Sequence, residues 1–84
     1  MIAEVAEKLT QHEKWIEKNP LRIFRKENNL SLRRMAGLIG VQVNTIQSWE
    51  FGGATPNDEN FARLEKFIPE IRNLWHEWLK SRTT

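Results

Sequence analysis

At residues 30–52 the chain reads LSLRRMAGLIGVQVNTIQSWEFG. Ser31 is a favourable helix start, because its hydroxyl can accept a hydrogen bond from a backbone N–H group one turn into the helix. Gly40 is placed to end that helix, because glycine readily adopts the left-handed conformation that turns the chain. A second helix is expected at about Val43–Phe51. The stretch therefore predicts two short helices joined by a turn that begins with glycine.

The two expected helices each have an inward and an outward side. In the first helix the inward residues at helical spacing are Leu32, Met35, Ala36 and Ile39. The second helix directs Ile46 and Trp49 inward, and Ala36 is small enough to let it cross closely. Its outward side chains are Asn44, Thr45, Gln47 and Ser48. Small polar side chains at the start of a helix can reach base edges, so the pattern predicts a helix-turn-helix that reads duplex DNA in the major groove.

The remainder of the chain also shows helical spacing of apolar residues. This spacing predicts a helix at about Ile2–Lys18 and another at Leu21–Glu27. Asn19-Pro20 separates the two, because a proline disfavours helix in the residue before it. No strand-like alternation extends over a useful length. We therefore expect an all-α chain.

Two further helices are expected after the glycine- and proline-rich turn at 52–56. Thr55 or Asn57 can cap the first of them, and Pro69 is expected to begin the last. The expectation is a single domain, 1–84, of about six short helices. It divides into an extra N-terminal helix at 1–19, a helix-turn-helix core at 20–68 and a C-terminal helix at 69–84.

Composition and charge narrow the class of protein. The chain has no cysteine, which excludes disulfides and thiolate metal sites, and no apolar run long enough to cross a membrane. The net charge is only +2, but residues 20–52 sum to +3, whereas 1–19 sum to −1 and 53–84 to zero. The positive charge thus lies where a phosphate-facing surface would need it. Because residues 1–9 lack a signal-peptide pattern, we expect a cytoplasmic, nucleoid-associated protein.

Residues 20–68 resemble the phage-repressor and Cro-type helix-turn-helix family, also called XRE-like. The most specific parts of the match are Gly40-Val41, Ile46, and Glu50 followed one residue later by Gly52. The other matching residues are Leu21, Arg25, Leu30, Ser31, Met35, Ala36, Ile39, Thr45, Trp49, Phe51, Pro56 and Leu64. The resemblance implies a compact, lambda-repressor-like bundle of about five to six short helices.

The resemblance also implies which residues contact DNA. The family's base-reading positions fall on Val43, Asn44, Gln47 and Ser48. Contacts to the DNA backbone are expected from Arg22, Arg25, Ser31, Gln42, Thr45 and Thr55. The family's arginine–glutamate pair falls on Arg25 and Glu50. Two residues depart from the family pattern. Leu32 stands in place of a phosphate-binding glutamine, and Val43 replaces a polar base reader and can offer only apolar contact, for example with a thymine methyl. The loop at 53–55 also lacks the family's lysines, so a weaker grip on phosphates is predicted than in basic relatives.

The function expected from these observations is sequence-specific binding of double-stranded DNA, hence regulation of transcription, with repression at a pseudo-palindromic operator. A homodimer is expected, with a possible dimer surface at Trp75, Trp78 and Leu79, because such aromatic patches mark interfaces. The alternative is an antitoxin- or adaptor-type module whose terminal helices bind a toxin or another protein. We expect no catalytic residues, metal, cofactor or membrane contact.

For the polar residues of the second helix, the competing interpretation is an ordinary solvated helix face. For Arg33 and Arg34, two interpretations are equally open: a solvated charge on the helix surface, or a ligand of a DNA phosphate. Trp49 is assigned to the core, where the family usually has leucine or isoleucine. RNA binding is less favoured, because no exposed aromatic residues for base stacking lie on the basic segment.

Overall fold

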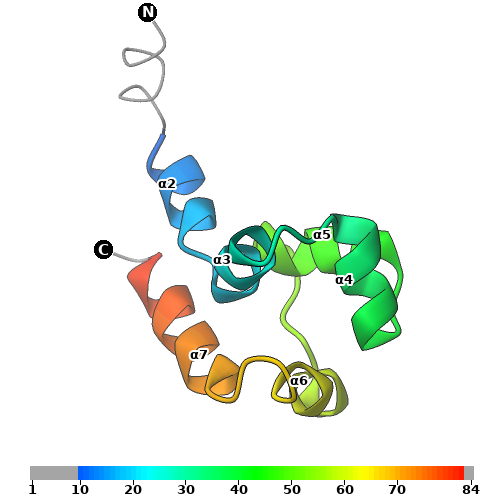
Figure 1. The fold of residues 1–84 in the computed structure, drawn as a ribbon. Coiled ribbons are helices and arrows are strands. Elements are labelled where there is room, and N and C mark those ends of the chain that lie inside the picture. Colours follow the sequence, from blue (N-terminus) through cyan, green and yellow to red (C-terminus); the bar gives the residue numbers. More distant parts are fainter. Residues whose placement is uncertain (1–9, 83–84) are drawn as a thin grey trace, which may run out of the picture.

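The computed structural model describes residues 10–82, in which the chain forms six α-helices and no strand. The helices are α2 (Gln11–Glu17), α3 (Pro20–Glu27), α4 (Leu32–Ile39), α5 (Val43–Glu50), α6 (Asp58–Leu64) and α7 (Ile71–Ser81). The predicted all-α architecture is confirmed. The part of the first expected helix that precedes Thr10 lies outside the described residues. Figure 1 shows α2 and α7 together on one side of the molecule, with α4 and α5 on the other.

Local capping explains where most of these helices begin. The side chains of Asn19, Ser31 and Asn57 each accept a hydrogen bond from a backbone N–H three residues later. Thr10 and Glu13 form a reciprocal capping box at the start of α2. Gly40 ends α4 with φ +84°, in the left-handed region predicted for it. The sequence therefore specifies most helix boundaries by short-range interactions.

The core lies where the last five helices meet. Each contributes one side chain that is fully buried, at 0% exposure: Leu21, Met35, Ile46, Leu64 and Ile71. Trp49 belongs to the same cluster, as predicted, and Ala36 is 3% exposed between α4 and α5. These contacts position α5 against the body of the domain and leave its other side to solvent.

The sequence-based interpretation of the C-terminal helix was wrong in two respects. The helix begins at Ile71 rather than at Pro69, after a turn. Trp75 and Trp78 are 1% and 4% exposed, and Leu79 is half-buried against the core, so the two indoles cannot form an exposed dimer surface. The physical reason is cover supplied from within the chain, because α2 packs an aromatic side chain on α7.

That cover is Trp15, which stacks on Trp78. The ring centroids are 3.9 Å apart and the planes differ by 4°. Each indole N–H donates to the backbone carbonyl of the other residue, at 2.7 Å in both directions. Both polar groups are therefore satisfied in a buried setting, where an unpaired N–H would be costly. The stacking and the two hydrogen bonds join α2, the first described helix, to α7, the last.

Gly52 lies directly against Trp15, just after α5. Its φ is +80°, and a Cβ added there would come within 2.5 Å of the Trp15 ring. Both the backbone conformation and the lack of space therefore require glycine. The contact joins the N-terminal helix to the end of α5.

We expect Gly52→Ala to lower the free energy of unfolding by about 2–4 kcal/mol, from backbone strain and overpacking against Trp15. The matched control is Gly37→Ala. Gly37 lies in α4 with no atom within 4 Å of an added Cβ, so this change should stabilise the protein by about 0.5–1 kcal/mol. Urea denaturation followed by tryptophan fluorescence measures both. Equal stability of the two variants would contradict the close approach of Trp15 to Gly52.

Candidate nucleic-acid interface

The outward side of α5 carries the polar residues singled out as base readers. Asn44 is exposed, and Gln47 and Ser48 are half-exposed. At these spacings the three side chains are neighbours on one stripe of the helix. Gln42, the N-cap residue, is exposed and makes no capping hydrogen bond, so its amide is available to a ligand. The structure thus groups four polar side chains, three of which are amides.

Val43 and Thr45 are placed differently from the other residues of this group. Val43 is half-buried and packs against the hydrophobic core. Thr45 is also half-buried. Among the four expected base readers, Asn44 is therefore the most accessible, while Val43 offers only part of its surface to a ligand.

The outer side of α4 presents uncompensated positive charge. Arg33 and Arg34 are exposed, and within residues 10–82 neither takes part in an ion pair. With Ser31, Gly37 and Leu38 they line a shallow depression of about 520 Å³. The Ser31 hydroxyl accepts from the Arg34 N–H at 3.0 Å. The sequence analysis left these two arginines open between solvated charges and phosphate ligands. Among the described residues the structure leaves both without an ion pair, so that each is available to a phosphate.

The loop after α5 folds back on that helix. The N–H groups of Gly53 and Ala54 both donate to the Ser48 carbonyl, at 2.8 and 3.3 Å. Thr55 is exposed beyond them, and Pro56 is buried. The loop thus leaves Thr55 exposed and adds no positive charge.

A buried ion pair joins α3 to the end of α5. Arg25 Nε donates to Glu50 Oε2 at 2.7 Å and Nη2 donates to Oε1 at 3.0 Å, while Nη1 donates to the Leu30 carbonyl at 3.0 Å. The Glu50 side chain is 1% exposed. The hydrogen bonds with Glu50 raise the pKa of Arg25 above its ordinary value. This bidentate geometry holds the last residue of α5 in a fixed position.

Arg22 shares the same carboxylate. Its Nη1 lies 3.6 Å from Glu50 Oε1, and its Nη2 lies 3.2 Å from Glu17 Oε1. The side chains of Arg22 and Arg25 are only 17% and 12% exposed. Two carboxylates therefore compensate the two arginines, and neither is an unpaired cation at the surface.

Asn19 is a positioning residue that the sequence analysis treated only as a boundary. It is 0% exposed. Its Oδ1 accepts from the Arg22 N–H at 2.9 Å, and its Nδ2 donates to the Trp49 carbonyl at 3.3 Å. Asparagine followed by proline is a recognisable helix start, which could have predicted the first contact. The second joins residues 30 apart and has no local signal.

The described residues form neither a metal-binding cluster nor a membrane-spanning helix. The part of the chain from 10 to 82 holds no group of three or more histidine, aspartate or glutamate side chains that could bind a metal ion. None of its helices is long and apolar enough to span a bilayer.

Comparison with known proteins supplies one match. A family model described as Helix-turn-helix matches residues 21–70, more than half of the chain. The comparisons with curated proteins and with solved structures found no match. The matched region begins at the second residue of α3 and ends just before α7, so it contains α4, α5 and the ion pair of Arg25 with Glu50.

We expect Arg25→Leu to lower the free energy of unfolding by about 3–5 kcal/mol, because it leaves Glu50 buried with only the longer contact to Arg22. The double variant Arg25→Leu/Glu50→Leu should lose less than the single one, since no uncompensated carboxylate remains. Urea denaturation of the wild type, Arg25→Leu, Glu50→Leu and the double variant measures the coupling free energy between the two side chains. A double variant whose loss equals the sum of both single losses would show that the two side chains act independently.

Proposed function

The chain belongs to the XRE-like helix-turn-helix family of DNA-binding transcription regulators, and we propose that it is a repressor that reads the major groove with α5. The observation that carries this proposal is the polar stripe of Asn44, Gln47 and Ser48 on the side of α5 that the core leaves open. Asparagine and glutamine amides can pair with adenine through two hydrogen bonds. We propose no enzymatic activity.

Contacts to the phosphates position such a protein on the duplex, whereas base contacts specify the site. Ser31, Gln42, Thr45 and Thr55 are proposed as polar backbone contacts. Arg33 and Arg34 are proposed in addition, because their charges are uncompensated. Arg22 and Arg25 are proposed to contribute less than free arginines would, since Glu17 and Glu50 neutralise them.

The proposed operator is pseudo-palindromic and bound by a homodimer. In this arrangement two recognition helices enter successive major grooves about 34 Å apart. Occupying a site that overlaps a promoter is sufficient to block transcription. The antitoxin- or adaptor-type alternative gains no separate support, because Trp75 and Trp78 are used inside the core.

We expect Gln47→Ala to change which base pair is preferred at one position of each half-site, with a loss of discrimination of about 1–3 kcal/mol. Arg33→Ala should instead weaken binding to all duplexes alike and reduce the slope of log K against log salt by about 1. Selection from randomised duplexes, followed by titration against salt, separates the two effects. A uniform loss with Gln47→Ala would remove Gln47 from the base-reading set.

A further inference from the structure

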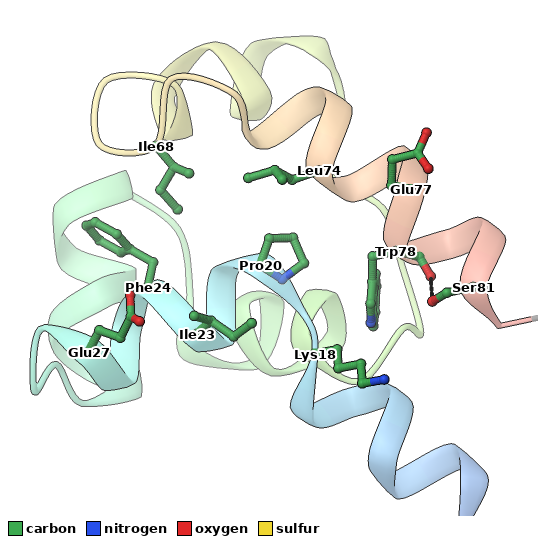
Figure 2. Close-up of a pocket in the computed structure, with 10 residues that line it drawn as sticks. All are labelled: Lys18, Pro20, Ile23, Phe24, Glu27, Ile68, Leu74, Glu77, Trp78 and Ser81. Carbon is green, nitrogen blue, oxygen red and sulfur yellow. Dashed lines mark hydrogen bonds between the residues drawn. The ribbon is translucent and has the colours of Figure 1, made fainter.

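An apolar groove runs between α3 and α7. It has a volume of about 410 Å³. Its apolar lining consists of Pro20, Ile23, Phe24, Ile68, Leu74 and Trp78. Ile23 and Leu74 are 41% and 43% exposed, which is a large apolar exposure for two facing positions. Figure 2 shows them on opposite sides of the groove.

The groove lies on the side of α3 away from the Glu50 ion pairs. At 100° per residue, Pro20, Ile23 and Glu27 form one stripe of the helix, and Arg22 and Arg25 lie on the other side. A molecule seated in the groove therefore leaves the contacts between α3 and α5 untouched. It also leaves the polar stripe of α5 open to DNA.

The two ends of the groove carry side chains of opposite charge. Lys18 lies just before α3 and Glu27 is its last residue, so about 12 Å of helix separates them. Both are exposed, and within residues 10–82 neither forms an ion pair. Figure 2 shows Lys18 at one end, beside Trp78, and Glu27 at the other. The third charged residue of the lining, Glu77, is paired with Lys80 at 3.6 Å.

A two-fold axis through the middle of the groove would place each end of one copy's groove against the opposite end of the other copy's groove. Lys18 of each copy then faces Glu27 of the other copy, and the apolar side chains of the two grooves meet between them. An unrelated partner would need the same charges in reverse order, whereas a second copy carries them by symmetry. The surface is thus complementary to itself in both charge and apolar character.

We propose that a second copy of this chain docks in the groove between α3 and α7 with two-fold symmetry. This inference rests on the proposed homodimer and assigns its interface. It replaces the surface expected at Trp75, Trp78 and Leu79, of which only Trp78, 4% exposed, reaches the groove.

Sedimentation equilibrium of the full chain without DNA tests the interface. Ile23→Glu should raise the dimer dissociation constant at least about 100-fold, since a carboxylate would be buried without a partner. The matched control is Leu38→Glu, because Leu38 is 38% exposed on α4, outside the groove, and this change should leave the constant within about threefold. A monomeric wild type, or equal effects of the two variants, would overturn the proposal.

A charge exchange tests the symmetry and does not depend on the folding of Ile23→Glu. Lys18→Glu and Glu27→Lys should each weaken the dimer about 3- to 10-fold by placing like charges opposite each other, and the double variant should recover the wild-type constant. Failure of the double variant to recover would overturn the two-fold arrangement.

Binding to a duplex that holds one half-site separates this inference from the proposed function. Ile23→Glu should bind a single half-site like the wild type and lose only the additional affinity for two half-sites. Wild-type dimerisation through the groove without any selective DNA binding would overturn the proposed function and leave the interface standing. Unchanged affinity of Ile23→Glu for two half-sites would overturn the interface and leave DNA binding standing.

Discussion

The structure depends on a buried carboxylate at the end of α5, the proposed recognition helix. Glu50 is the last residue of α5, where the helix dipole disfavours a negative charge, and it is 1% exposed. It is compensated there by Arg25, which donates two hydrogen bonds to it, and by Arg22 at 3.6 Å. Apolar side chains of similar volume could fill this space at comparable stability. A bidentate pair, however, fixes the direction of α5 relative to α3, and the role proposed for α5 needs that direction to be constant.

The terminal helices contribute to the same constraint. Asn19 reaches the Trp49 carbonyl, and Trp15 fills the space beside Gly52, so two more contacts fall within three residues of Glu50. Trp15 is in turn held by the reciprocal hydrogen bonds with Trp78. The end of α5 is therefore fixed from α2, α3 and α7 together, while its polar start remains free. The two helices outside residues 21–70, α2 and α7, therefore hold α5 in place as well as completing the core.

How far the sequence predicts this arrangement depends on the range of each interaction. The caps at Ser31 and Gly40 involve neighbours within one helical turn, and local rules predicted both. The pairing of Arg25 with Glu50 spans 25 residues and came only from the family resemblance. The error at Trp75 and Trp78 has the same origin. An aromatic stripe looks identical in sequence whether a second chain covers it or, as here, Trp15 covers it from 63 residues away.

The charges give the proposed homodimer a role in DNA binding. Residues 20–52 carry a net charge of +3, yet Glu17 and Glu50 neutralise Arg22 and Arg25, so Arg33 and Arg34 hold the exposed positive charge of α4. Each phosphate contact adds salt-sensitive affinity, and α4 of a single copy offers two arginines, unpaired within residues 10–82, for such contacts. Joining two copies makes the second half-site contact intramolecular, which multiplies affinity without new phosphate contacts. A groove that faces away from the arginines of α3 is a suitable place to join them, because docking there uses none of the side chains proposed to contact DNA.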